Sequence, residues 1–200
     1  MKVLGRVHQR WIFRRRVRVL ARHLAALLPE GASVLDVGCG DGSIDRLIAD
    51  ARPDLRIEGI DVKARPDAVV PVREFDGRTI PYDDDAVDVV MLVDVLHHAR
   101  EPAHLLGEAV RVARRALVIK DHTREGWLAG ATLRLMDWVG NAPHGVALPY
   151  HYWREAEWRR AFQGLDATPS VWIGRLGLYP PPASWLFDRS LHFVARLDLT

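Results

Sequence analysis

Cysteine is almost absent from this 200-residue sequence, and long apolar runs are absent altogether. The single cysteine, Cys39, excludes an internal disulfide framework and is typical of a reducing compartment such as the cytoplasm. No apolar run approaches the roughly 20 residues that a transmembrane helix needs. The basic N-terminus lacks the apolar core and the small-residue cleavage site that would follow in a signal peptide. We therefore expect a cytoplasmic protein.

Acidic residues are missing before Glu30, although the whole chain is nearly balanced, with 28 Lys and Arg against 26 Asp and Glu. The basic residues of this first segment are Lys2, Arg6, Arg10, Arg14, Arg15, Arg16, Arg18 and Arg22. They overlap an apolar row at helical spacing, from Phe13 through Val17, Leu20 and Leu24 to Leu28. We expect an amphipathic helix that packs on the domain with its arginines in water. Peripheral contact with a membrane surface, or docking of an acceptor, is the alternative.

Apolar runs alternate with amphipathic segments over the first 122 residues. The runs are Ser33–Val37, Arg56–Ile60, Val69–Val72, Val87–Val93 and Ala116–Ile119, and helical patterns cover Ser43–Ala51 and Pro102–Arg115. Continuous apolar runs, unlike strict alternation, indicate parallel strands that are covered on both faces. The sequence therefore predicts a doubly wound α/β unit.

The second half has a different composition, because six of the seven tryptophans lie there. Its predicted elements are helices at Trp127–Val139 and Trp153–Phe162, a loop at Asn141–Tyr150, and strands at Val171–Arg175 and His192–Leu197. No repeat or linker divides the chain, so we expect one domain over residues 1–200. Within it, residues 1–29 form a helical arm, 30–122 a core, and 123–200 a lid with closing strands.

The most informative segment is Val34–Gly42, VLDVGCGDG. A buried strand runs into closely spaced glycines and then into a helix, which lets a ligand approach the backbone. Dinucleotide-binding folds also place glycines there, with the spacing G-x-G-x-x-G. Here the spacing is G-x-G-x-G and Asp36 precedes the first glycine. Carboxylates around the loop favour a cationic ligand over a pyrophosphate, and a NAD-type oxidoreductase remains the less favoured alternative.

The run VLDVGCGDG resembles the first signature of the class I S-adenosylmethionine-dependent methyltransferases. Further segments match in the expected order: Gly59–Asp61 (GID), Phe75–Gly77 (FDG), Ala86–His98 (AVDVVMLVDVLHH) and Ala116–His122 (ALVIKDH). The resemblance covers about residues 30–122. It implies a Rossmann-like, doubly wound mixed sheet of about seven strands, with an N-terminal helix and lid insertions in the second half.

The resemblance also implies a site for S-adenosylmethionine and its product, S-adenosylhomocysteine. The residues that it assigns to this cofactor are Asp36, Gly38, Cys39, Gly40, Asp61, Val62, Asp76, Gly77 and Val93. Asp61 would accept hydrogen bonds from both ribose hydroxyls, and Asp76 would accept one from the adenine amine. Asp36 and the Val93 carbonyl would orient the ammonium group of the methionine moiety.

Histidines near the ends of the fourth and fifth predicted strands are candidates for acceptor chemistry. His98 and His122 are the candidate catalytic bases, and a structural role is the alternative for each. The other predicted acceptor-pocket residues are His97, His144, Tyr150 and His151. No metal ligand set is predicted.

The tryptophans of the second half favour a small, hydrophobic or aromatic acceptor. Val93–Leu96 stands where nucleic-acid methyltransferases carry their acceptor motif, so a nucleic-acid partner is not expected. Two further alternatives stay open: cyclisation of S-adenosylmethionine on the same fold, and a non-catalytic, RNA-associated module that uses the basic arm.

Overall fold

The structure is a computed structural model that describes residues 2–141, 151–165, 167–188 and 190–200, with side chains from residue 13 onward except 137–141. The strands are β1 (Ser33–Val37), β2 (Arg56–Asp61), β3 (Val72–Glu74), β4 (Val87–Val93), β5 (Ala113–His122), β6 (Ala167–Ile173) and β7 (His192–Leu199). The helices are α1 (Lys2–Ala25), α2 (Ser43–Ala51), α3 (Pro102–Val112), α4 (Ala129–Asn141), α5 (Glu155–Gln163) and α6 (Ser184–Phe187), and a short 3-10 turn, η1, spans Leu96–His98.

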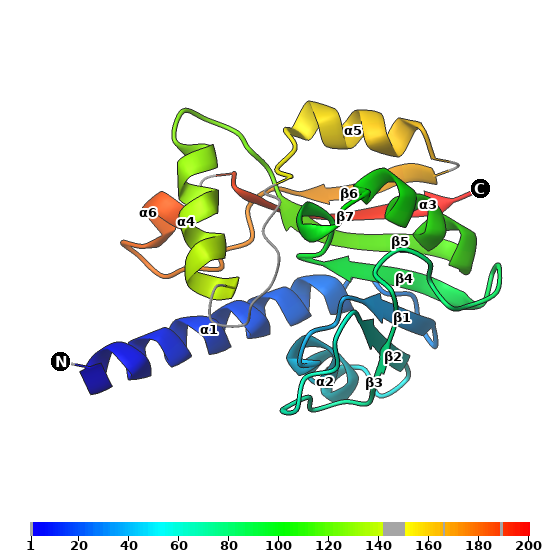
Figure 1. The fold of residues 1–200 in the computed structure, drawn as a ribbon, viewed down its shortest axis with the longest axis horizontal. Helices are drawn as coiled ribbons and strands as arrows, with labels where there is room; N and C mark the ends of the chain where they lie inside the picture. Colours follow the sequence, from blue (N-terminus) through cyan, green and yellow to red (C-terminus); the bar gives the residue numbers. More distant parts are fainter. Residues whose placement is uncertain (1, 142–150, 166, 189) are drawn as a thin grey trace.

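The strands form one sheet in the order β3-β2-β1-β4-β5-β7-β6 (Figure 1). The first five strands pair in parallel, whereas β7 runs antiparallel to both β5 and β6. The predicted mixed, doubly wound sheet of about seven strands is therefore confirmed. Strand order reverses between β1 and β4, and ligands of open α/β sheets bind beyond the carboxyl ends of the strands at such a point.

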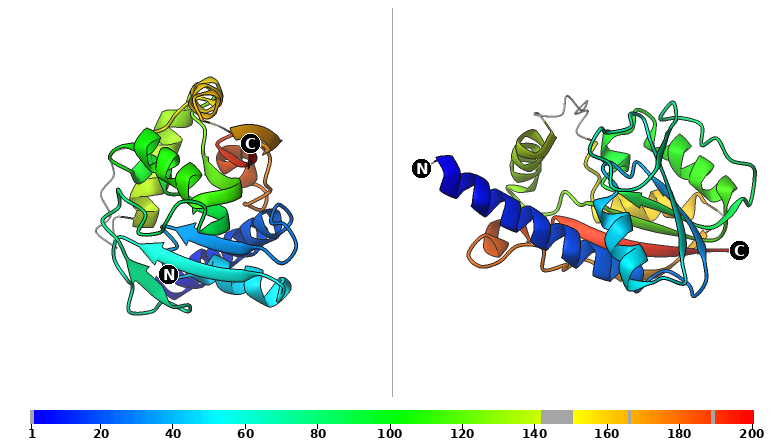
Figure 2. Two further views of the ribbon diagram at one scale, coloured as in Figure 1. Left: turned by 90° about the vertical axis from the view of Figure 1, so that its right-hand side faces the viewer. Right: turned by 90° about the horizontal axis from the view of Figure 1, so that it is seen from below.

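Helices cover both faces of the sheet, as the continuous apolar strands require. On one face α3 and α5 pack against the sheet, with Trp158 and Phe162 of α5 fully buried. On the other face α1 and α2 supply buried side chains such as Leu24 and Ile48. Figure 2 shows the long α1 crossing beneath the sheet, with its N-terminal half projecting beyond the carboxyl ends of the strands.

The predicted elements exist, but several of their boundaries differ. The N-terminal helix begins at Lys2 and ends at Ala25, so it starts earlier than the apolar row that predicted it. The β5 strand begins at Ala113 and takes residues that the helical pattern had assigned to α3. The β6 strand starts at Ala167 and includes Pro169, which it tolerates because β6 is an edge strand. None of the helices in the described ranges is long and apolar enough to cross a membrane.

We predict that Leu24→Ala lowers the free energy of unfolding by about 3 kcal/mol, because it leaves a cavity between α1 and the sheet. Leu24 is fully buried, whereas Phe13, on the same helix, is 52% exposed. Phe13→Ala is therefore the matched control, with an expected change below about 1 kcal/mol. Urea denaturation measures both. Equal effects of the two substitutions would contradict the packing of α1 described above.

Candidate cofactor and acceptor site

The loop between β1 and α2 brings backbone, and not side chains, to the carboxyl edge of the sheet. Gly38 and Gly42 have φ values of 80° and 71°, in the left-handed region that favours glycine. A Cβ on Gly38 would lie 2.5 Å from a methyl group of Val95, and one on Gly42 would collide with Val70. The Gly38 amide donates to the Ile60 carbonyl at 2.7 Å, which holds the loop beside the end of β2. The loop is therefore a fixed cradle that side chains would fill.

Asp61 ends β2 and faces this cradle. Its Oδ2 atom accepts a hydrogen bond from the Gly40 amide at 2.8 Å, and its Oδ1 atom accepts one from the Lys63 amide at 3.2 Å. The carboxylate is thereby fixed at the strand end, partly exposed and beside the glycine loop. The family resemblance predicted a ribose-binding carboxylate at this position.

Two buried acids lie beneath the loop. Asp36 of β1 and Asp45 of α2 are each 2% exposed, and their carboxyl groups lie close enough to share a proton. Burial raises the pKa of both carboxyls, that of Asp45 to about 7, and the neighbouring charge of Asp45 raises that of Asp36 further. Burial and the same two acids raise the pKa of the Cys39 thiol, which lies against Gly59.

The two buried acids determine which charge the site accepts in a cofactor. Among the described residues, no other group donates a hydrogen bond to the Asp36 Oδ1 atom. A cation brought to the loop would favour loss of the shared proton, whereas a pyrophosphate would meet repulsion from the same acids. The residues present therefore fit a cationic ligand such as a sulfonium or ammonium group.

The remaining predicted cofactor residues lie along the same edge. Asp76 is exposed, and its Oδ1 atom accepts from the Arg78 and Thr79 amides at 2.8 and 2.7 Å, which lowers its pKa. Gly77, at φ 76°, approaches exposed Val62 so closely that a Cβ would lie 2.8 Å from it. Val93 ends β4 and is 9% exposed. Whether each of them touches the cofactor stays a prediction.

A second polar group lies where β4 and β5 end. Asp94 follows β4 with φ 57°, and its amide donates to the Lys120 carbonyl at 2.9 Å. The buried Lys120 ammonium pairs with the Asp94 carboxylate, and His122 Nε2 lies 3.3 Å from the same oxygen. Burial opposes ionisation of Asp94, but the neighbouring positive charge, above all that of Lys120, holds the pKa of its carboxyl well below the usual value.

Histidines complete this group. His97 Nδ1 lies 2.6 Å from the Asp121 carboxylate, and both side chains are 1% exposed. The His97 ring packs on the His98 and His122 rings, with centroid distances of 3.9 and 4.7 Å. Burial, then the Lys120 charge, lowers the pKa of His122 and of His192 well below the usual value. Those two rings are therefore neutral at physiological pH.

The structure thus brings together three of the histidines that the sequence predicted: His97, His98 and His122. His151 is exposed and packs beside them, with its Nδ1 atom 3.1 Å from the Ala99 carbonyl. His144 and Tyr150 lie outside the described residues. Sequence reasoning missed the other members, Asp94, Lys120 and His192. Charged residues at the ends of otherwise apolar strands were the signal that could have found them.

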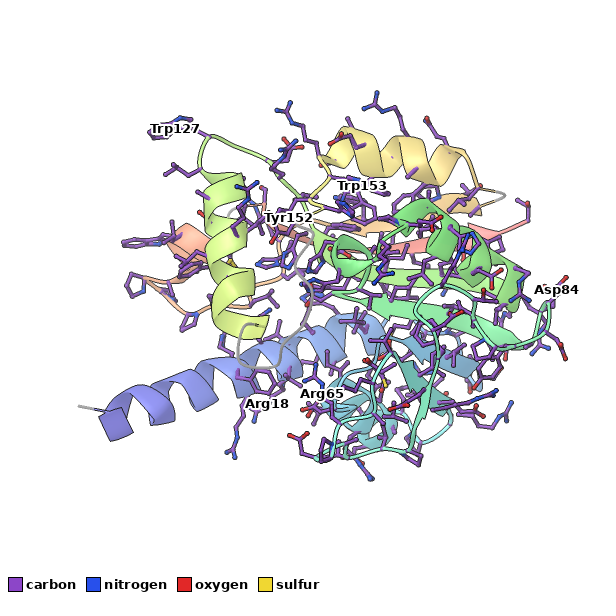
Figure 3. The ribbon with its side chains drawn as sticks, viewed as in Figure 1. Arg18, Arg65, Asp84, Trp127, Tyr152 and Trp153 are labelled. Carbon is purple, nitrogen blue, oxygen red and sulfur yellow. The ribbon has the colours of Figure 1, made fainter. Side chains whose placement is uncertain are left out.

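The described tryptophans do not gather around this group as expected. Trp127 and Trp185 are 94% and 75% exposed, and Figure 3 shows Trp127 pointing away from the sheet at the start of α4. Trp153 packs on Trp158, on the face that α5 covers. The Trp158 indole donates to the His122 carbonyl at 2.9 Å and so supports β5 from behind. Trp127 and Trp185 line a hollow of about 750 Å³ together with Arg175 and Asp188, so an acceptor pocket with tryptophan walls stays a prediction.

A groove of about 770 Å³ lies between α1 and the start of α2. Its walls combine the apolar side chains of Phe13, Val17 and Leu47 with the basic ones of Arg14, Arg18 and Arg46. Ser43, which directly follows the glycine loop, also lines it. The groove therefore adjoins the loop from the α1 side.

Comparison with known proteins agrees with this geometry. The fold and the glycine loop are those of a class I S-adenosylmethionine-dependent methyltransferase. A solved S-adenosylmethionine-dependent methyltransferase of Aquifex aeolicus superposes with a TM-score of 0.59 at 20% identity, covering 86% of this chain and 85% of that one. A family model described as "Methionine biosynthesis protein MetW" matches residues 18–159. The chain belongs to this MetW family.

Two curated relatives are named as methyltransferases. An uncharacterized methyltransferase of Mycobacterium leprae (strain Br4923) is 33% identical over 182 residues, which cover 78% of this chain and 65% of the relative. The 27-O-demethylrifamycin SV methyltransferase of Amycolatopsis mediterranei (strain S699) is 33% identical over 110 residues, 48% of this chain and 40% of the relative. The chain thus spans between two fifths and two thirds of the length of these relatives.

We predict that the Asp36–Asp45 pair makes stability depend on pH. Because the folded-state pKa of Asp45 is raised to about 7, its contribution to stability is full below about pH 4 and is lost as pH rises towards 7. Asp45→Asn removes this loss, so the fall in unfolding free energy from pH 5 to pH 8 should shrink by about 2 kcal/mol. Asp50→Asn, at an exposed position of the same helix, is the control. Parallel pH profiles for wild type and Asp45→Asn would exclude a shared proton.

Proposed function

We propose that this protein transfers the methyl group of S-adenosylmethionine to a small-molecule acceptor and releases S-adenosylhomocysteine. One observation carries the proposal. The glycine cradle stands between a fixed carboxylate, Asp61, and a buried pair of acids, at the point where strand order reverses. Membership of the MetW family and the two relatives named as methyltransferases support it.

The cofactor would supply an electrophilic methyl group on a cationic sulfur. Asp61 would accept hydrogen bonds from the ribose hydroxyls with oxygens that the Gly40 and Lys63 amides already hold in place. Asp36 and Asp45 would attract the positive end of the ligand, with release of their shared proton. The glycine backbone would leave room for the chain of atoms between these two ends.

The acceptor would lie beyond the ends of β4 and β5, over the group that contains Asp94, His97 and His122. This placement would align the attacking atom with the methyl group and keep water out. During transfer the acceptor atom forms the bond to the methyl carbon, the sulfur keeps the electron pair of the broken bond, and a hydroxyl acceptor gives up its proton. His98 and His122 remain the proposed bases for that proton.

The nature of the acceptor follows from the polarity of this edge. Ionisable side chains, held by hydrogen bonds, favour an acceptor whose reacting atom is polar, such as a hydroxyl. A hydrophobic or aromatic body for that acceptor stays our prediction. A relative whose name gives it a rifamycin as acceptor is consistent with a small molecule of this kind.

The name of the MetW family suggests a second candidate, a place in methionine biosynthesis. The polar edge at β4 and β5 is compatible with a small, polar acceptor from such a pathway. Methylation assays with small hydroxyl compounds, thiols and amino acids, in parallel with aromatic hydroxyl compounds, decide between the two acceptor types.

We predict that S-adenosylhomocysteine raises the melting temperature, because a ligand that binds only the folded state stabilises it. Asp61→Ala should weaken this binding by about 2–3 kcal/mol, the usual range for lost charge-assisted hydrogen bonds. Asp83→Ala, at an exposed acid far from the loop in sequence, is the matched control. Titration calorimetry measures the affinities, with NAD as the competing ligand class. A preference for NAD would overturn the methyltransferase assignment.

Turnover can be tested independently of affinity. We expect methyl-labelled S-adenosylmethionine and a small-molecule extract to give a labelled product together with S-adenosylhomocysteine. The product should be lost in Gly38→Val, since any side chain there meets Val95 and fills the cradle. Release of the labelled methyl group on methylthioadenosine, without S-adenosylhomocysteine, would point instead to cyclisation of the cofactor itself.

A further inference from the structure

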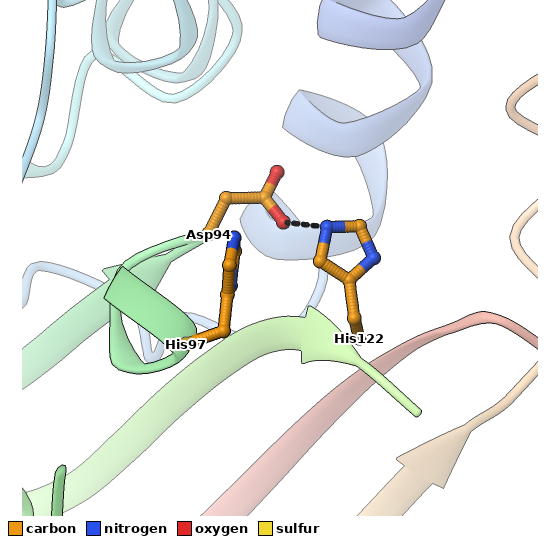
Figure 4. Close-up of side chains that lie close together, drawn as sticks. All are labelled: Asp94, His97 and His122. Atoms are coloured by element: carbon orange, nitrogen blue, oxygen red, sulfur yellow. Dashed lines mark ion pairs between the residues drawn. The ribbon is translucent and has the colours of Figure 1, made fainter. Parts of the chain in front are cut away.

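The three side chains at the centre of the acceptor edge have the composition of a metal site. Asp94, His97 and His122 each offer one ligand atom, and these atoms all lie within 4.8 Å of one another. Figure 4 shows the carboxylate and the two imidazole rings converging on one region from the ends of neighbouring strands. Two imidazoles and a carboxylate are a donor set typical of zinc enzymes and of other first-row metal sites.

The spacing suits such an ion. The Asp94 Oδ1 and His122 Nε2 atoms are 3.3 Å apart. Two ligand atoms at bond lengths of about 2.0–2.2 Å stand about 3.3–3.5 Å apart around a tetrahedral centre. This pair therefore has the right separation, and the His97 ligand atom lies within 4.8 Å of both, so its ring can reach the ion by moving closer.

The strongest support comes from the atoms behind the ligands. His97 Nδ1 is held by the Asp121 carboxylate at 2.6 Å, and His122 Nδ1 lies 3.3 Å from the Leu191 carbonyl. With Nδ1 engaged in this way, Nε2 is the nitrogen that each ring would turn to a metal. Metal-binding histidines almost always have this second partner, a carboxylate or a backbone carbonyl, which fixes the ring and its tautomer. Both histidines meet that condition here.

The burial pattern distinguishes the three ligands. His97 and His122 are 1% and 4% exposed, whereas the Asp94 side chain is 29% exposed. The group is therefore closed on the protein side and open beside Asp94. Catalytic zinc sites have three protein ligands and one such open position for water or substrate.

Lys120 is the feature that opposes an ion. Its buried ammonium pairs with the Asp94 carboxylate, so a metal ion would have to exchange with this partner. Competition of this kind lowers the affinity of the site but does not remove its donors. It also gives the proposal a specific test, because removing the ammonium should make the ion bind more tightly.

We propose that Asp94, His97 and His122 bind one divalent transition-metal ion, with Zn²⁺ favoured by the donor set and the fourth position open to the acceptor. An acceptor oxygen on such an ion becomes more acidic. The charge of the ion would then help the acceptor oxygen to lose its proton, which is the task otherwise assigned to a histidine base. Binding of the ion itself does not depend on the proposed methyl transfer.

The test uses the full chain, stripped with a chelator and without cofactor or acceptor. Co²⁺ is the probe, because its visible absorption reports coordination by nitrogen and oxygen, and Zn²⁺ is then titrated in competition. We expect one ion per chain, with at least a tenfold loss of affinity in Asp94→Ala and in His122→Ala. His104→Ala, at an exposed histidine of α3, is the matched control and should bind like wild type.

Lys120→Met tests whether Asp94, His97 and His122 form a metal site or only happen to lie close together. We expect it to bind Co²⁺ on the order of tenfold more tightly than wild type, since the cation that occupies Asp94 is gone. Circular dichroism and thermal unfolding establish that each variant is folded. Absence of stoichiometric binding in wild type, or equal binding in wild type, Asp94→Ala and His122→Ala, would overturn the proposal. Because no cofactor is present, neither result bears on methyl transfer.

Discussion

The structure depends on one constraint: a sheet that is covered on both faces can hold charges only where its strands leave the core. From Val89 to Val93 in β4 and from Ala116 to Ile119 in β5, every side chain is apolar and buried. Beyond those positions Asp94, Lys120 and Asp121 follow directly. Unpaired buried charges are very costly, so each of these groups has to face an opposite charge or a hydrogen-bond partner. The pairing, and not packing alone, fixes the geometry of this edge.

The same constraint works differently under the glycine loop. There the buried groups are two acids, and among the described residues the charges that act on them are those of other acids. Burial raises the pKa of both carboxyls, which favours a proton held between them. When a cation binds beside such a pair, the proton leaves and the pair becomes more negatively charged. The loop and the strand edge therefore differ in charge: the acids under the loop suit a positive ligand, whereas the Asp94 carboxylate at the strand edge is already paired with Lys120.

The cofactor half of the site could be predicted because its residues are close in sequence. The turn from β1 to α2 needs glycine for local reasons, so Gly38 and Gly42 mark it without knowledge of the fold. The acceptor half could not be predicted in the same way. Lys120 and His192 meet only because β7 returns antiparallel beside β5, a pairing that no local pattern encodes. The places of the tryptophans could not be predicted for a related reason, since composition alone does not distinguish a pocket wall from a core layer such as the stacked Trp172 and Phe193.

The segment that follows β4 connects the two halves. Val95 packs on Gly38, close enough that any side chain there would collide with it, while the residues on either side of Val95 belong to the acceptor edge. Asp94 pairs with Lys120, and the Leu96 amide donates to Asp121 at 3.1 Å. A shift of the glycine loop towards the sheet would therefore displace Val95 and, with it, the carboxylate and the imidazole of its neighbours. Since this segment is only a short turn fixed at both ends, the cofactor cradle and the acceptor edge cannot move independently. In the proposed function, the backbone between Val93 and His98 would thus set the relative position of methyl donor and acceptor.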